Sequence, residues 1–260
     1  NNEDYTIWFD GFGSLIFSIK KGDEKSLQWV EINSNPNWNP RQYHESIIDS
    51  NDNIYILGGF DDNYDVLNDV WKSEDDGQTW VEVNSYASWS PRRYHTTVID
   101  SNDNIYIMGG YGNFDDFNDV WKSEDGGVTW TEITTSANWT KRKNHTSVID
   151  SNDNIYLLGG YTSGFDYKND VWKSEDGGQT WIEVNSGATW SPRRYHTSVI
   201  DSNDNIYIMG GQDETSRDAN DVWKSEDGGQ TWIEVNNSTG WGERTHHTSV
   251  IDSNDNLYIL

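Results

Sequence analysis

The sequence predicts an all-β fold: a five-bladed β-propeller of four-stranded antiparallel blades, whose ring is closed by N- and C-terminal half-blades. The first observation is a W-x-x-R-x-x-H motif that recurs five times, with 50 or 51 residues between successive arginines. The second is that each period holds four short strand-like runs separated by turn residues, without helical periodicity longer than one turn. The third is that the first and last units are incomplete in complementary ways.

The unit that follows His145 shows the expected elements, which we call strands a to d. Strand a is expected at 146–149, strand b at 155–158, strand c at 170–174 and strand d at 180–184. Asn, Asp and Gly fill the a–b and c–d turns, because these residues adopt left-handed turn conformations at low cost. Strands a and b are mostly apolar, as inner strands should be. Strand d carries an acid among its apolar residues at Glu82, Glu132 and Glu183, which predicts a partly exposed outer strand.

We expect one propeller domain over residues 1–260. Its whole blades are expected at about 44–83, 95–133, 145–184 and 196–235. The fifth blade would combine a half at 14–32, which provides strands c and d, with a half at 247–260, which provides strands a and b. Joining the halves would remove exposed strand edges. A second arrangement stays open, because residues 5–9 resemble another strand b and the chain could be a piece of a larger ring.

Composition excludes several classes of function. The chain has 44 acidic and 18 basic residues and a net charge of −26, so nucleic-acid phosphates would be repelled and we expect no nucleic-acid partner. It has no cysteine, which excludes disulfides and thiolate metal sites. It lacks a run of 18 apolar residues, so we expect no transmembrane helix and no membrane insertion.

Two family resemblances cover nearly the whole chain. A strand b that ends in Gly-Gly, followed by a later Trp and then R-x-x-H, resembles the kelch repeat. The c–d turn resembles the Asp-box (BNR) repeat, S-x-D-x-G-x-T-W, in four copies that begin at Ser73, Ser123, Ser174 and Ser225. Both resemblances imply a β-propeller, and the Asp-box family implies that this turn is structural. Neither implies a chemistry, because such rings host enzymes and binding modules alike.

Strands that alternate in direction place the a–b and c–d turns at one end of the ring, which we call the turn face. It carries the sequence DSNDN five times and four acidic c–d turns. Hard cations prefer oxygen ligands, so Ca²⁺ at this acidic face is one interpretation. Solvated hairpins are the other, because Asp and Asn are ordinary turn residues and DSNDN lacks the spacing of a calcium loop. We favour hairpins and expect neither a metal nor another cofactor.

The b–c and d–a loops share the opposite end, which we call the loop face. Arginine beside aromatic rings suits an anionic or sugar ligand. The candidate ligand-binding residues are Trp38, Arg41, Trp89, Arg92, Trp139, Arg142, Trp190, Arg193, Trp241, Arg244, Tyr111, Phe114, Tyr161 and Phe165. A structural interpretation is also open, in which each Arg pairs with a carboxylate or carbonyl of the next blade while Trp and His fill the joint. Five equivalent copies favour it, and the loop aromatics could cap the outer core.

We expect a non-enzymatic binding or scaffold propeller, secreted or at a cell surface, that presents the loop face to a glycan or protein partner. No catalytic residue is expected, because an active centre breaks symmetry and every Arg, His and Trp of the motif has equivalents. One alternative is a structural module of a surface filament, self-associated through acidic turns and basic loops. Another is a glycoside hydrolase of the sialidase type, although the chain offers no unlike carboxylate pair.

Overall fold

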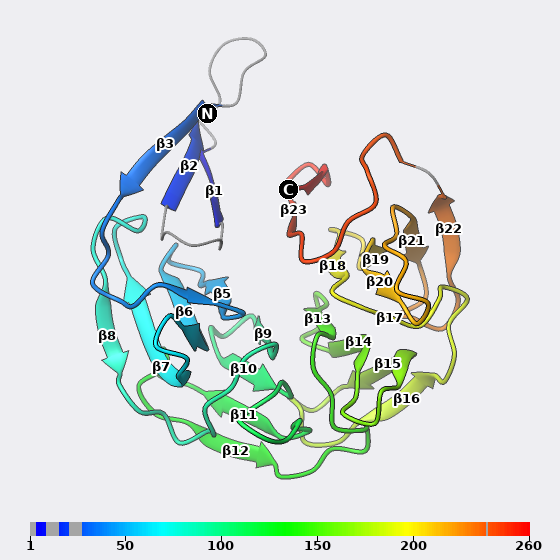
Figure 1. The fold of residues 1–260 in the computed structure, drawn as a ribbon, viewed down its shortest axis with the longest axis horizontal. Helices are drawn as coiled ribbons and strands as arrows, with labels where there is room; N and C mark the ends of the chain where they lie inside the picture. Colours follow the sequence, from blue (N-terminus) through cyan, green and yellow to red (C-terminus); the bar gives the residue numbers. More distant parts are fainter. Residues whose placement is uncertain (1–3, 9–15, 21–27, 238) are drawn as a thin grey trace.

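The computed structural model describes residues 4–8, 16–20, 28–237 and 239–260, and the regular structure in these ranges is entirely β-strand. Small sheets stand around a common axis, each with one strand near the axis and one at the outer edge (Figure 1). This is the blade arrangement of a β-propeller, so the all-β class is confirmed. None of the described residues belongs to a helix long and apolar enough to cross a membrane.

Four blades are complete, with strands a to d hydrogen-bonded in chain order. The first contains β5 (Glu45–Ile48), β6 (Ile54–Asp61), β7 (Val66–Ser73) and β8 (Val81–Asn84). The second contains β9 (Thr96–Ile99), β10 (Ile105–Met108), β11 (Val120–Ser123) and β12 (Thr131–Thr134). The third contains β13 (Thr146–Ile149), β14 (Ile155–Tyr161), β15 (Tyr167–Ser174) and β16 (Ile182–Asn185). The fourth contains β18 (Thr197–Ile200), β19 (Ile206–Met209), β21 (Val222–Ser225) and β22 (Ile233–Asn236).

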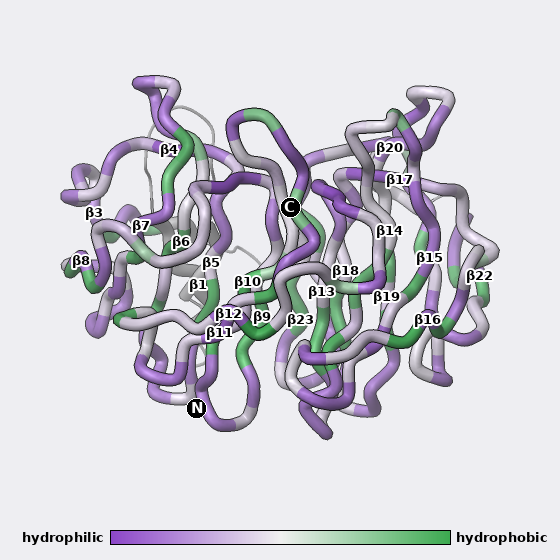
Figure 2. The backbone as a smooth tube through the Cα atoms, turned by 90° about the horizontal axis from the view of Figure 1, so that it is seen from below, coloured by the Kyte–Doolittle hydropathy of each residue, from purple (hydrophilic) through white to green (hydrophobic). Residues whose placement is uncertain are grey.

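Short strands extend two of these blades on the loop side. β4 (Arg41–Gln42) pairs with the end of β6, and β17 (Arg193–Arg194) pairs with β20 (Gln212–Asp213). Both pairs join the d–a loop to the b–c loop of the same blade. In Figure 2, β4 on one side of the molecule and β17 and β20 on the other lie toward the same end. The two kinds of loop therefore share one face, as the alternating strand directions predict.

The prediction of five blades is wrong, because the two chain ends do not complete a fifth. β1 (Asp4–Trp8), β2 (Ile16–Lys20) and β3 (Gln28–Asn33) form one antiparallel sheet, and β23 (Ser249–Ile251) and β24 (Leu257–Ile259) form another. Closure required strand b from the C-terminal half to pair with β2. Residues 4–8 already occupy that position, since Asp4 faces Lys20 and Trp8 faces Ile16. The other residues of the expected half-blade 14–32 lie outside the described ranges.

The hairpins of the turn face use their acids as internal hydrogen-bond acceptors. Asp49 accepts bonds from the backbone N–H groups of Asn51 and Asn53, both at 2.9 Å. In the c–d turn, Asp75 accepts bonds from the N–H of Thr79 at 2.8 Å and from its hydroxyl at 2.7 Å. The same bonds recur in the following blades at Asp100, Asp150 and Asp201 and at Asp125, Asp176 and Asp227. These acids thus close turns of the kind expected for solvated hairpins.

The hydrophobic core lies at the joints between blades. At the first joint, Tyr55 and Leu57 of one blade pack with Ile105 and Trp130 of the next and with Trp89 from the connecting loop. Equivalent clusters fill the next two joints. The outer strands β8, β12, β16 and β22 stay largely exposed, which confirms the expectation for strand d. Each blade is therefore stabilised chiefly by its neighbours, as in other repeat proteins.

Hydrogen bonds between neighbouring blades link them at both ends of the joint. On the turn face, Ser50 donates its N–H and hydroxyl to Asp103 of the next blade, at 2.9 and 2.6 Å, and three later Ser–Asp pairs repeat this contact. Near the axis, the N–H of Tyr94 donates to the carbonyl of Tyr43, and the bond recurs from blade to blade. The residue at this position is left-handed in every copy, with φ between 55° and 60°: Tyr43, Tyr94, Asn144, Tyr195 and His246.

The Gly-Gly pairs are required where strand b passes the start of strand a. Gly110 has a φ of 94°, and a Cβ built on it would lie 2.7 Å from the Cβ of His95. Only glycine avoids both the unfavourable φ and the overlap.

We therefore expect Gly110→Ala to lower the free energy of unfolding by roughly 2 kcal/mol or more, because it adds backbone strain and a clash. Gly187→Ala is the matched control, since a Cβ there would have no atom within 4 Å. Urea denaturation should show an unchanged or slightly raised midpoint for the control. Equal midpoints for the two variants would contradict this account of the Gly-Gly pair.

Candidate ligand-binding loop face and axial pocket

The arginines of the motif are buried and ion-paired. Arg92 makes a two-pronged contact with Asp119, at 2.8 Å from Nη1 and 2.7 Å from Nη2, and its Nη1 also donates to the carbonyl of Gly109. Asp119 stands 27 residues downstream, at the start of strand c of the same blade. Arg41, Arg142 and Arg193 make the same contacts with Asp69, Asp170 and Asp221. The guanidinium thus ties the d–a loop to strands b and c of the blade that follows the loop, as the structural interpretation of the motif expected.

The tryptophans of the motif fill the joints. Trp89 is completely buried and meets the Trp130 ring edge-on at 5.9 Å, and the later joints repeat this pair. The buried members of the candidate set are Trp38, Arg41, Trp89, Arg92, Trp139, Arg142, Trp190 and Arg193. Trp241 and Arg244 are half-buried. A ligand on the loop face does not reach the eight buried side chains in this structure, and their contacts fit the structural interpretation of the motif.

The loop aromatics divide into an exposed and a covered set. Tyr64, Phe114 and Phe165 are 81, 88 and 82 % exposed, and each stands at the tip of a b–c loop in one of three consecutive blades. Tyr111 and Tyr161 are half-buried at the loop bases. The candidate binding set therefore contained two tip residues, Phe114 and Phe165, but did not include the loop aromatic Tyr64, which holds the same loop position as Phe165.

Cations and aromatic rings alternate beneath these tips. Arg93 lies over Phe60 at 4.2 Å, Lys143 over Tyr111 at 3.9 Å and Arg194 over Tyr161 at 4.6 Å. Each of these cations follows a motif arginine by one residue and lies against the loop base of the preceding blade. The contacts attach neighbouring loop bases to one another and give the exposed tips a rigid support.

A small pocket lies where the inner strands begin at the axis. It has a volume of about 120 Å³. Its lining consists of Tyr43, His44, Glu45, Tyr94, His95, Asn144, His145, Tyr195 and His196. Glu45 was missed by the sequence analysis, although the signal was available. The strands that start with Thr96, Thr146, Thr197 and Thr248 place threonine where the first blade has this acid.

Burial shifts the pKa values of the motif histidines and of Glu45 in opposite directions. Desolvation, with a smaller effect of the nearby motif arginines, lowers the pKa of His44, His145 and His196 to about 3 and that of His247 to about 4. Desolvation raises the pKa of Glu45 to about 8, against a smaller opposing effect of Thr97. The imidazoles are therefore neutral at pH 7.

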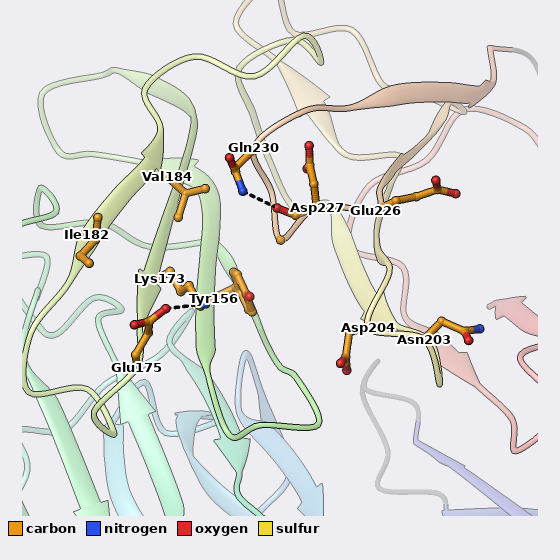
Figure 3. A pocket seen from close by; sticks show the side chains of 11 residues that line it. Tyr156, Lys173, Glu175, Ile182, Val184, Asn203, Asp204, Glu226, Asp227 and Gln230 are labelled. Carbon is orange, nitrogen blue, oxygen red and sulfur yellow. Dashed lines mark hydrogen bonds and ion pairs between the residues drawn. The ribbon is translucent and has the colours of Figure 1, made fainter.

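The turn face has grooves between adjacent blades. One, of about 500 Å³, lies between the third and fourth blades and is lined on one side by Lys173 and Glu175 and on the other by Asp204 and Asp227 (Figure 3). Lys173 donates to Glu175 at 2.7 Å, and Asp204 already accepts two bonds from Ser151. No group of three or more His, Cys, Asp or Glu in the described part of the chain is placed to hold a metal ion.

Comparisons with known proteins agree with this architecture. The profile of the DUF6242 beta propeller domain matches residues 8–122 and 42–175, which together span more than half of the chain. The profile of the KLHDC2/KLHL20/DRC7 Kelch-repeats domain matches residues 129–260. The solved structure of YjhT is similar with a TM-score of 0.80 and 15 % identity, over 100 % of this chain and 87 % of that chain. At this identity the likeness concerns the fold alone. No curated protein matches the chain.

Because Arg142 is buried and ion-paired, we expect its removal to destabilise the fold far more than removal of the neighbouring Lys141. Arg142→Ala should lower the free energy of unfolding by roughly 3–5 kcal/mol, because it leaves the carboxylate of Asp170 buried without its partner. The exposed neighbour provides the control, since Lys141→Ala should change it by less than about 0.5 kcal/mol. Urea denaturation measures both. A loss for Arg142→Ala no larger than that of the control would rule out the structural role.

The lowered histidine pKa values predict a stability that falls as the pH falls from 6.5 to 5. The unfolded chain takes up protons near pH 6.5 and the folded chain does not, so each buried histidine contributes a slope of roughly 1.4 kcal/mol per pH unit. The raised pKa of Glu45 acts in the opposite sense, because it destabilises the fold as the pH rises from about 4.5 to 8. Urea midpoints at half-unit intervals should therefore drop toward pH 5, and His145→Gln should reduce the slope by about one histidine's share. A midpoint independent of pH in the wild-type chain and the variant would refute this.

Proposed function

The chain belongs to the kelch-repeat β-propellers, and from this premise we propose that it is a non-enzymatic binding protein that presents its b–c loop tips to a glycan or protein partner. The sites of contact are the three tip aromatics Tyr64, Phe114 and Phe165. This assignment moves the expected binding residues outward, from the motif tryptophans and arginines to the ends of the variable loops.

The observation that carries the proposal is the backbone conformation of two tips. Tyr64 and Phe165 have φ values of 68° and 66°, a region that bulky residues rarely adopt and that glycine occupies without cost. The equivalent residue of the fourth blade is the small Ser216, with a φ of 61°. A large ring in this conformation is strained and exposed, and neither property stabilises the fold. Strain of this kind concentrates at functional sites.

The chemistry of the tips suits such partners. Tyr64 meets Phe60 edge-on at 6.0 Å, and Phe165 meets Tyr161 at 6.4 Å, so each exposed ring has a defined orientation. Aspartates flank the rings at positions 65, 115 and 166 and supply hydrogen-bond acceptors for hydroxyl or amide groups. Three such tips on one rigid face would gain affinity by acting together.

Two observations weigh against the competing functions. The loop-face carboxylates at the start of strand c, such as Asp119, are held by buried arginines, and a glycosidase acid or base needs a free carboxyl group. A filament made of acidic turns against basic loops needs exposed cations, whereas the motif arginines of the four blades are buried and neutralised. The loop tips thus remain the best-supported contact surface.

A glycan array and a pull-down from surface-protein extracts should identify a partner for the wild-type chain. The triple variant Tyr64→Ala, Phe114→Ala, Phe165→Ala should then bind it about 1000-fold more weakly, at roughly tenfold for each ring, with little change in melting temperature. Tyr86→Ala removes an exposed aromatic outside the tips and should bind normally. Undiminished binding by the triple variant would disprove the proposal.

A further inference from the structure

One position near the axis departs from the repeat. At the start of β9, β13 and β18, the hydroxyls of Thr96, Thr146 and Thr197 lie 3.1 Å from Nε2 of a histidine in the next blade. The partners are His145, His196 and His247. The first blade has Glu45 at this position, so the hydroxyl that would meet His95 is absent.

His95 is left without the bond that its equivalents make. His95 is only 1 % exposed, and its Nε2 has no hydrogen-bond partner. A neutral imidazole has one nitrogen that accepts a hydrogen bond, and leaving a buried polar atom unpaired costs free energy. His95 and Glu45 line the same axial pocket. The departure from the repeat therefore places two groups in one pocket: the unpaired Nε2 of His95 and the carboxyl group of Glu45.

The walls of the pocket select for charge and size. Among the residues that the structure describes, the lining contains no lysine or arginine, and Glu45 is its one carboxyl group. Three tyrosines are among the lining residues; the rings of Tyr43 and Tyr94 lie 4.1 Å apart, and Tyr195 lies 3.7 Å from the ring of His246, which is not in the lining. Aromatic faces attract cations. The volume of about 120 Å³ corresponds to roughly four water molecules and admits only a small organic group.

We propose that the axial pocket binds a small organic monocation, a primary ammonium group or its methylated forms. Burial raises the pKa of Glu45 to about 8, so the side chain would release its proton as the cation enters, and its carboxylate would then neutralise the positive charge. The tyrosine side chains would lie beside the ligand, and an N–H of the ligand would donate to Nε2 of His95. A metal ion fits less well, because no metal-ligating group of three is present among the described residues. This site uses none of the loop-tip residues, so a test of cation binding is independent of a test of the proposed partner binding.

The experiment compares methylammonium chloride with sodium chloride at equal ionic strength, using calorimetric titration and thermal melting. Methylammonium should bind the wild-type chain and raise its melting temperature above the sodium chloride reference. Sodium acetate, matched in the same way, should give no specific shift, since the described lining residues offer an anion no lysine or arginine.

Glu45→Thr is the decisive variant, because it restores the residue found in the other blades. It should bind methylammonium at least tenfold more weakly and melt a few degrees higher than the wild-type chain, through a new bond to His95. Glu45→Gln, which removes only the charge, should also lose binding. Glu82→Thr makes the same exchange on the exposed strand β8 and should retain it. Equal methylammonium affinity in the wild-type chain and Glu45→Thr, or a response no larger than that to sodium chloride, would overturn the proposal.

Discussion

The contact on which each blade depends is the buried pair between a motif arginine and the first aspartate of strand c. The guanidinium of Arg142 reaches three segments at once: its own d–a loop, the carbonyl of Gly159 and the carboxylate of Asp170. The indole N–H of Trp172 donates to the same carboxylate, so both charges are fully hydrogen-bonded. Removing one partner of such a pair is costly, whereas the complete set is tolerated in the interior. The motif therefore recurs wherever a blade must form, whatever the protein binds.

Blades held in this way still need one another, because their apolar surface lies at the joints. Trp89 arrives from the loop between two blades and belongs to the core of neither alone. The Ser–Asp hydrogen bonds of the turn face and the backbone hydrogen bonds near the axis fix the same joint at its two ends. The many acids of the turn face serve as acceptors in these contacts. The net charge of −26 thus arises largely from residues that close turns and joints.

The sequence was sufficient for the strands, the turns and the exposed outer strand, because each depends on neighbours in the chain. The number of blades was not predicted correctly, since it depended on whether residues 4–8 pair with β2, a contact between segments of weak pattern. The structural interpretation placed the partner of each arginine in the correct blade, but spacing alone did not say which carboxylate accepts the guanidinium. Glu45 was not identified because the repeat motif is defined by the residues that the units share, and Glu45 is a position where the first blade differs from the others.

The positions that differ between the blades are the best candidates for ligand contacts. Positions present in all blades are explained by the ion pair, the joint and the turns, and they leave little free to meet a ligand. The exceptions are few: large aromatics at strained loop tips, where the fourth blade has Ser216, and a lone acid in a row of threonines. Both exceptions lie at the loop-face end of the ring, because Glu45 begins strand a just after the loop that carries Arg41. A partner seated on the tips and a small cation at the axis would meet on one face, and any coupling between them would be reciprocal.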